Sequence, residues 1–142
     1  MTSITRQQVG DGLSPAPILI IDDDEGIRDL VTLALGDEGY QVLAAANGAA
    51  ALELLRQERE RPGVILLDTR MPVMDGAAFA SAYRGEALPH APIILLTAAA
   101  EADTIAEELE ADAVLQKPFD LDELLSLIDR FNPAPGATSP GS

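Results

Sequence analysis

Short runs of apolar residues recur along the chain, and each ends at or beside a polar side chain. Four of them are Ile18–Ile21 before Asp22, 64–67 before Asp68, 93–96 before Thr97, and 114–115 before Gln116 and Lys117. A weaker run, at 41–45, precedes Asn47 and Gly48. Continuous apolar runs of this length are typical of strands that are buried on both faces of a parallel sheet.

The stretches between these runs carry apolar residues at helical spacing, which predicts helices. The residues that show this spacing are Ile27, Leu30, Val31 and Ala34; Leu52 and Leu55; and Leu121, Leu124, Leu125 and Ile128. Predicted N-caps are Asp24, Asn47, Asp75 and Asp120. Strand and helix therefore alternate about five times, which predicts a doubly wound α/β domain with right-handed crossovers.

The two ends of the chain differ in composition from the part between them. Residues 1–16 are mostly polar, and residues 132–142 are rich in Pro, Gly, Ser and Ala. We expect a flexible lead-in over 1–16, one domain over 17–131 and a disordered tail over 132–142. A length of 142 residues suits one domain of this size.

Charge and composition narrow the possible partners. The formal net charge is −15, with 24 acids against 9 bases, so direct binding of nucleic acid is not expected. The chain has no cysteine, which excludes disulfides and thiolate chemistry. No apolar segment approaches the roughly 20 residues of a membrane span, and the start has no secretory stretch. A cytoplasmic location is therefore the expectation.

The candidate chemistry lies where the predicted strands end. In parallel α/β sheets ligands bind beyond the carboxyl ends of the strands, and five polar residues occupy those positions: Asp22, Asp23, Asp68, Thr97 and Lys117. Three neighbouring carboxylates repel one another, by roughly 4 kcal/mol for a pair at about 4 Å, so they favour a hard cation. Mg²⁺, or Mn²⁺ in its place, suits such oxygen ligands. A carboxylate there can also act as a nucleophile toward phosphorus.

The chain resembles the receiver domain of bacterial two-component response regulators over residues 17–131. The motifs that carry the resemblance are Ile-Leu-Ile-Ile-Asp22-Asp23-Asp24-Glu25, Leu-Leu-Asp68-Thr-Arg-Met-Pro72-Val-Met-Asp75-Gly76, Leu-Leu-Thr97-Ala98 and Lys117-Pro118-Phe119. The resemblance implies a flavodoxin-like, three-layer (βα)₅ sandwich. Its five parallel strands are expected in the order 2-1-3-4-5, as in known folds of this type.

The resemblance also implies a role for each residue of the site. Asp68 matches the phosphoacceptor, and Asp23 and Asp22 match the metal-binding acids, Asp23 directly and Asp22 mainly through water. The backbone carbonyl of Arg70 matches a third metal ligand. Thr97 and Lys117 match the groups that hold the phosphoryl oxygens.

Two smaller features follow from the same resemblance. The Lys117–Pro118 peptide bond is expected to be cis, and Pro72 and Asp75 belong to the loop that presents Asp68. Family members often carry an aromatic ring three residues before the lysine, where it moves inward as the threonine shifts. This chain has Val114 there, a stiff side chain without a ring, so the resemblance does not extend to that readout.

The last third of the chain is strongly acidic. Arg130 is almost the only base to oppose Glu107, Glu108, Glu110, Asp112, Asp122, Glu123 and Asp129. Regulators that pair through this face match acids with bases, so repulsion disfavours that symmetric contact here. His90, the only histidine, lies in a predicted loop and is expected to have no role in phosphotransfer.

The leading interpretation is a stand-alone receiver, a signalling switch rather than an enzyme. A sensor histidine kinase or a histidine phosphotransfer protein would phosphorylate Asp68, and an unknown protein effector would read the result. An alternative is a pseudo-receiver, a scaffold on the same fold that is never phosphorylated. An aspartyl-phosphate hydrolase or mutase is disfavoured because Arg70 stands where those enzymes place a second acid. Flavin binding is disfavoured because no phosphate-binding loop follows the first strand.

Overall fold

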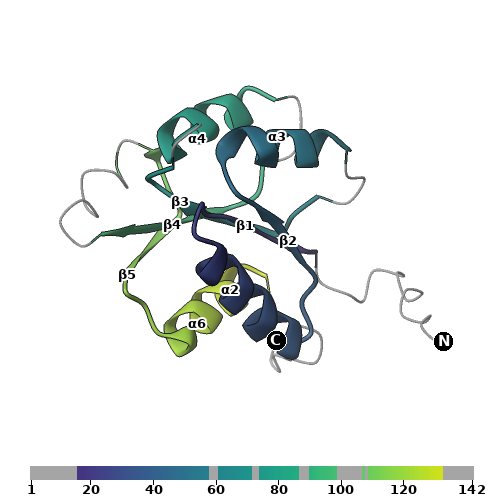
Figure 1. The fold of residues 1–142 in the computed structure, drawn as a ribbon, viewed down its shortest axis with the longest axis vertical. Helices are drawn as coiled ribbons and strands as arrows, with labels where there is room; N and C mark the ends of the chain where they lie inside the picture. The colour runs from purple at the N-terminus through teal and green to yellow at the C-terminus, as the bar shows by residue number, and fades with distance from the viewer. Residues whose placement is uncertain are drawn as a thin grey trace.

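The computed structural model describes residues 16–57, 61–71, 74–86, 90–98, 107 and 109–132. Pro72, Glu108 and nearly all of the predicted lead-in and tail lie outside the described residues, so the predictions made for them stay predictions. The described part forms an alternating series of strands and helices around one sheet (Figure 1).

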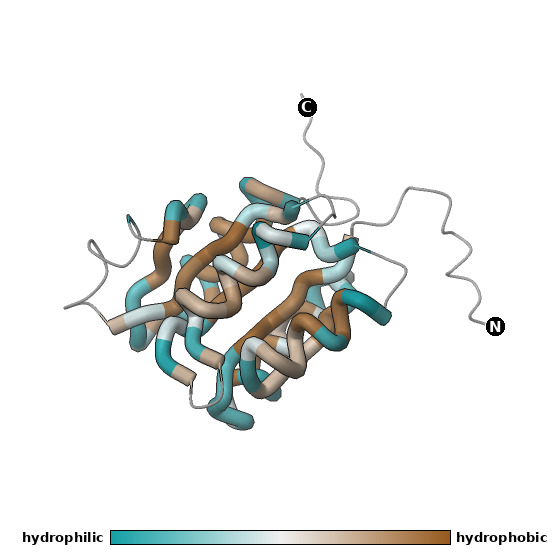
Figure 2. The backbone as a smooth tube through the Cα atoms, turned by 90° about the horizontal axis from the view of Figure 1, so that it is seen from above, coloured by the Kyte–Doolittle hydropathy of each residue, from teal (hydrophilic) through white to brown (hydrophobic). Residues whose placement is uncertain are grey.

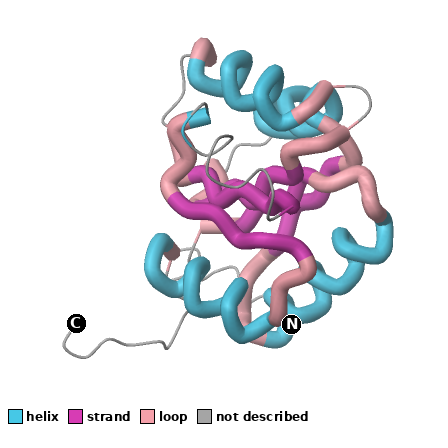
Figure 3. Tube along the Cα trace, turned by 90° about the vertical axis from the view of Figure 1, so that its left-hand side faces the viewer, coloured by secondary structure: helices cyan, strands magenta, loops and turns pink. Residues whose placement is uncertain are grey.

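The sheet has five parallel strands in the order β2-β1-β3-β4-β5. The strands are β1 (Ile18–Ile21), β2 (Val42–Ala45), β3 (Val64–Asp68), β4 (Ile93–Ala98) and β5 (Ala113–Lys117). Helices α3 (Gly48–Gln57) and α4 (Gly76–Arg84) cover one face of the sheet, and α2 (Glu25–Asp37) and α6 (Leu121–Phe131) cover the other (Figures 1 and 3). The predicted three-layer α/β fold and its strand order are confirmed.

The core lies on both faces of the two central strands. The apolar side chains of β1 and of residues 64–67 in β3 are fully buried, and Figure 2 shows these strands as the hydrophobic centre between the helices. Alternate side chains of a strand enter opposite layers, so Leu67 packs toward α3 and α4 while Leu66 packs toward α2 and α6. Burial of each such Leu or Ile stabilises the fold by about 1.5–3 kcal/mol. The two central strands therefore hold the residues at their ends in fixed positions.

All four predicted N-caps accept hydrogen bonds from the helix that they begin. The carboxylates of Asp24, Asp75 and Asp120 do so for α2, α4 and α6, and Asn47 Oδ1 accepts from the Ala50 amide at 2.8 Å for α3. At Asp120 the cap is reciprocal, because the Glu123 side chain returns to the Asp120 amide. Asp24, Asp75 and Asp120 follow the candidate site residues Asp22, Asp68 and Lys117 along the chain. These three caps therefore also fix where the next helix begins after each site residue.

One residue of the predicted helical pattern in α2 is exposed. Val31 and Leu35 are fully buried under the sheet, but Leu30 is 47% and Leu33 67% exposed. Helical spacing places Leu30 beside Val31, on the edge of the buried stripe, where the sheet no longer covers it. The helix was predicted correctly, but its apolar face is narrower than the sequence indicated.

A group of residues, here called the polar anchor, ties the end of α6 to the amino ends of the strands, opposite the ends that carry the candidate site. It consists of Tyr40, Asp129, Asn132, Ala16 and Gly63. The Tyr40 hydroxyl lies 3.0 Å from Asp129 Oδ1 and 2.5 Å from the Asn132 carbonyl, and Asn132 Nδ2 donates to the Ala16 carbonyl at 2.8 Å. Burial, followed by the hydrogen bond to Asp129, raises the pKa of Tyr40, so the phenol stays a protonated donor at physiological pH.

Candidate functional site

The polar residues predicted at the strand ends lie along one edge of the sheet. Asp22 directly follows β1, Asp68 ends β3, Thr97 lies near the end of β4, and Lys117 ends β5. These four strands are parallel and adjacent, so their carboxyl ends meet at the same rim. The structure therefore brings together the residues that the sequence placed there.

Three carboxylates form a compact acidic cluster on this rim. One oxygen from each of Asp22, Asp23 and Asp68 lies within 4.8 Å of the others. Asp22 is fully buried and Asp68 is 5% exposed, whereas Asp23 is open to solvent. Buried carboxylates this close repel one another strongly, so the cluster favours either a proton or a cation.

Lys117 offsets part of this negative charge. Its Nζ atom lies 3.1 Å from Asp22 Oδ2 and 3.3 Å from Asp68 Oδ1, so it bridges two of the three acids. Burial lowers the pKa of Lys117, but attraction to Asp22 and Asp68 outweighs burial and leaves its pKa above the usual value. The pKa of Asp68 is also raised, first by burial and then by the charge of Asp22, with Lys117 acting against both. One ammonium thus does not satisfy three carboxylates.

Backbone and side-chain donors hold Asp22 in place. The amide of Asp24 donates to Asp22 Oδ1 at 3.0 Å, and Arg28 Nη1 donates to the Asp22 carbonyl at 2.9 Å. Both donors belong to the start of α2, so the cap of that helix and the acid of the site share one short segment. Sequence reasoning did not assign Arg28 to the site, because its contact is with a backbone atom.

Residues that follow Asp68 also contribute to its surroundings. The Arg70 amide lies 3.4 Å from Asp68 Oδ1, and the Arg70 side chain is exposed. Gly76, at the start of α4, donates its amide to the Thr69 carbonyl at 3.3 Å. A Cβ atom at Gly76 would meet backbone atoms at 2.9 Å, so only glycine allows α4 to start this close to the end of β3.

Thr97 has a partner that the sequence did not indicate. The Oγ1 atoms of Thr69 and Thr97 are hydrogen-bonded at 3.2 Å, and both side chains are buried. In the sequence, Thr69 stands out only as part of the motif around Asp68. The contact depends on the register that pairs Asp68 with Leu96, and this register places the two threonines side by side.

The Lys117–Pro118 peptide bond is cis, as the resemblance implied. Pro118 and Phe119 lead from β5 into the capped start of α6. Phe119 and Phe131 are partly buried against the layer under α2 and α6, so both rings pack against the core.

The acidic cluster fits a divalent cation of the Mg²⁺ type. Its ligand atoms are carboxylate oxygens, the excess of negative charge remains after Lys117 is counted, and the exposed Asp23 leaves a way in from solvent. Asp22, Asp23 and Asp68 are the side chains that would hold the ion. When bound, Mg²⁺ supplies positive charge opposite a phosphoryl group, beside the charge that Lys117 already provides.

A comparison with protein-family models matches residues 18–129 to the response regulator receiver domain. The chain belongs to this family. A receiver is a signalling switch rather than a conventional enzyme, and its partner on the input side is a histidine kinase or a phosphotransferase. Among the described residues, no helix has the length and apolar content that crossing a bilayer requires.

Individual receivers and receiver-containing proteins support the assignment. Sporulation initiation phosphotransferase F of Bacillus subtilis is 38% identical over 118 residues, which cover 82% of this chain and 93% of that protein. Regulatory protein AtoC of Escherichia coli is 39% identical over 115 residues, which cover 80% of this chain but 24% of that protein. A structure of response regulator TrrA of Thermotoga maritima in complex with Mg²⁺ and BeF has a TM-score of 0.71 at 32% identity, covering 82% of this chain and 98% of that one.

The position that is often aromatic in receivers lies beside the core layer under α3 and α4. Val114 pairs with Leu95 across β4 and β5 and is partly buried against that layer. Its side chain offers neither a ring nor a hydrogen bond. Any coupling of Thr97 to the rest of this receiver through position 114 is therefore limited to packing.

Several acids of the predicted acidic face have partners within the receiver. Asp112 Oδ2 accepts from the Ile93 amide at 2.8 Å, Glu123 completes the α6 capping box, and Asp129 lies against Tyr40. These three acids have structural roles that the sequence did not reveal. The repulsion predicted for a symmetric pairing through this face stays a prediction that rests on the remaining acids.

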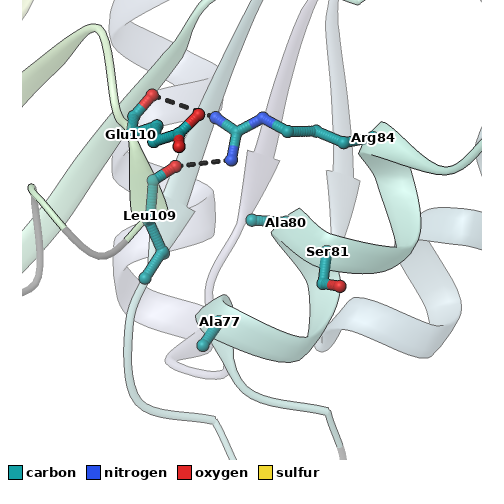
Figure 4. Close-up of a pocket in the computed structure, with 6 residues that line it drawn as sticks. All are labelled: Ala77, Ala80, Ser81, Arg84, Leu109 and Glu110. Atoms are coloured by element: carbon teal, nitrogen blue, oxygen red, sulfur yellow. Dashed lines mark hydrogen bonds between the residues drawn. The ribbon is translucent and has the colours of Figure 1, made fainter.

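The receiver also has a pocket of about 350 Å³ on the α4 side, and none of its lining residues belongs to the acidic site. Arg84 reaches across it and donates to the Leu109 carbonyl and, at 3.0 Å, to the Glu110 carbonyl (Figure 4). Ala77, Ala80 and Ser81 line the same pocket from α4. These two hydrogen bonds tie α4 to residues 109 and 110, which precede β5.

Proposed function

We propose that this receiver accepts a phosphoryl group on Asp68 from a phosphohistidine of its partner. The observation that carries the proposal is the position of the Asp68 carboxylate, which ends the buried strand β3 inside a cluster of two further acids and one ammonium group. A carboxylate oxygen of Asp68 attacks phosphorus, the P–N bond to the donor imidazole breaks, and an acyl phosphate forms. The released imidazole nitrogen keeps the electron pair of that bond and takes up a proton.

The other site residues have complementary parts in this proposal. Asp22, Asp23 and Asp68, with the backbone carbonyl of Arg70, would hold the metal ion. Lys117 Nζ already contacts Asp68, so it is placed to pair with one phosphoryl oxygen. The Thr97 hydroxyl donates to another. These groups neutralise the charge on the equatorial oxygens, which is the main requirement of phosphoryl transfer.

Intact-mass measurement tests the proposal directly. The chain is incubated with Mg²⁺ and either acetyl phosphate or phosphoramidate, a small donor with the P–N bond of phosphohistidine. We expect a gain of one phosphoryl group, lost in Asp68→Asn and retained in Asp120→Asn, which changes a helix cap in the same chemical way. No gain with either donor would favour a pseudo-receiver. A gain that persists in Asp68→Asn would place the acceptor at another residue.

The partners beyond this step are proposed only by class. A protein with a phosphorylated histidine delivers the phosphoryl group, and a protein effector binds the phosphorylated receiver. A cytoplasmic location remains a prediction, and fractionation of cells that express the chain would test it.

A further inference from the structure

Two hydroxyl groups meet inside the protein next to the phosphoacceptor. Thr69 is 7% and Thr97 1% exposed, and their Oγ1 atoms are 3.2 Å apart. Both threonines follow strand residues that pack toward α3 and α4, namely Leu67 and Leu95, at a spacing of two. They therefore point to the same side of the sheet, at its rim end.

The backbone holds Thr69 from both sides. Its amide donates to the Leu96 carbonyl at 3.3 Å on β4, and its carbonyl accepts the amide of Gly76 at 3.3 Å from the start of α4. Because Thr is also β-branched, its rotamer freedom at such a position is small. The Thr69 hydroxyl is thus held at a fixed place beside Thr97.

The direction of the hydrogen bond matters for the chemistry. A hydroxyl has one proton to donate and lone pairs to accept with. Either hydroxyl of this pair can donate to the other, but once Thr97 gives its single proton to another acceptor, Thr69 has to be the donor in the Thr69–Thr97 contact. A phosphoryl oxygen on Asp68 accepts but cannot donate once ionised, so it needs this polarity and not the reverse. A chain of two hydroxyls in this order also polarises the terminal donor.

We propose that Thr69 is a positioning residue for phosphoryl binding: its hydroxyl donates to Thr97 and so directs the Thr97 proton to a phosphoryl oxygen on Asp68. The inference rests on the proposed function of Asp68 and Thr97, and adds a residue that touches neither the phosphoryl group nor the metal ion. Val114, on the same side of the sheet, has no polar group that could do this instead.

Removal of one hydroxyl without change of shape tests this inference. Thr69→Val keeps the branched side chain and loses the donor, and Thr69→Ser keeps the donor and loses a methyl group. The probe is beryllofluoride with Mg²⁺, which stands in for the phosphoryl group, titrated by NMR. We expect Thr69→Val to bind the probe about fivefold more weakly, the usual contribution of one neutral hydrogen bond, and Thr69→Ser to restore most of the affinity.

The same pair of variants in a Thr97→Val background separates positioning from general damage. Without the Thr97 hydroxyl, Thr69→Val has nothing to direct, so we expect it to have no further effect on probe affinity. Three-bond couplings of the Thr97 methyl group give a second readout that needs no ligand. Thr69→Val should broaden the χ1 distribution of Thr97, and Thr69→Ser should keep it narrow.

Two results would overturn the inference. Unchanged or tighter probe binding in Thr69→Val would show that the hydroxyl pair is neutral or competes with the phosphoryl group. An equal loss in both Thr97 backgrounds would show a structural role alone. The proposed function fails separately, because in that case the wild-type chain would neither gain mass nor bind the probe.

Discussion

A Cβ atom on Gly76 would lie 2.9 Å from the backbone oxygen of Asp68. It would also lie 2.9 Å from the Cα atom of Thr69. Both neighbours are backbone atoms of the segment that carries the phosphoacceptor, so neither can rotate away as a side chain would. The start of α4 and the position of Asp68 are therefore mechanically linked.

Gly76→Ala should consequently damage both stability and chemistry. We expect a loss of about 1–3 kcal/mol in the free energy of unfolding, as for other overpacked sites, and slower phosphorylation by acetyl phosphate. Urea unfolding and the time course of mass gain measure the two effects. Gly36→Ala is the matched control, since a Cβ there meets nothing within 4 Å and α2 should gain about 0.5–1 kcal/mol. Normal stability of Gly76→Ala would contradict the close approach.

Much of this site was predictable because it depends on order along the chain. Apolar runs identified the strands, and parallel topology brings Asp22, Asp68 and Lys117 to one rim whatever the details of packing. Thr69 could not be found in this way. Its contact with Thr97 depends on the register of β3 against β4, which no local pattern encodes.

Three other features could not be predicted from the sequence, because they also depend on how distant parts of the chain are arranged in space. The contact of Tyr40 with Asp129 joins residues 89 positions apart, and the role of Gly76 is a distance between backbones rather than a turn. Exposure of Leu30 depends on how far the sheet extends over α2. Helical spacing predicts which residues share a face, but not how wide the covering surface is.

Lys117→Met should have opposite effects on metal binding and on phosphorylation. Loss of the ammonium 3.1 Å from Asp22 and 3.3 Å from Asp68 leaves the cluster more negative, so Mg²⁺ affinity should rise several-fold. Phosphorylation should be largely lost, because one phosphoryl oxygen has no counter-charge. Calorimetric Mg²⁺ titration and intact mass measure the two.

Arg56→Met provides the control for Lys117→Met. Arg56 pairs with Glu86 at 2.8 Å on the exposed surface, and its loss removes a positive charge without touching the rim. It should leave both Mg²⁺ affinity and phosphorylation unchanged. Weaker Mg²⁺ binding in Lys117→Met would mean that the lysine organises the cluster rather than competing with the ion.

Without divalent cations, Asp68→Asn should unfold at a higher urea concentration than the wild type at neutral pH. The folded protein raises the pKa of Asp68, through burial and then Asp22, so the ionised form costs stability above that pKa. The cost disappears as pH falls and Asp68 becomes protonated in both the folded and unfolded states. The gain from Asp68→Asn should therefore shrink in acid, and Mg²⁺ should stabilise the wild type more than the variant. A less stable variant at neutral pH would argue against net repulsion in the cluster.

The polar anchor at the other end of the sheet offers a test of stability alone. A Cβ on Gly63 would lie 2.5–2.9 Å from side-chain atoms of Asn132, so Gly63→Ala should cost about 1–3 kcal/mol. Asn132→Ala loses the hydrogen bond to Ala16 and should cost about 1 kcal/mol. In the double variant the clash is absent, so the combined loss should fall short of the sum by about 1 kcal/mol or more in urea unfolding. Strict additivity would show that Asn132 moves aside freely.

The complete burial of β1 and of residues 64–67 has a consequence for how receivers of this kind can diverge. Backbone amides on these strands open only when the whole domain does, so they should be the slowest to exchange hydrogen. The acids keep their geometry while helix surfaces away from the starts of α2 and α4, which contact Asp22 and the segment of Asp68, accept substitutions. Residues that recognise partners can then change without disturbing the residues that handle phosphate, because the two sets rest on parts of the fold that open at different free energies.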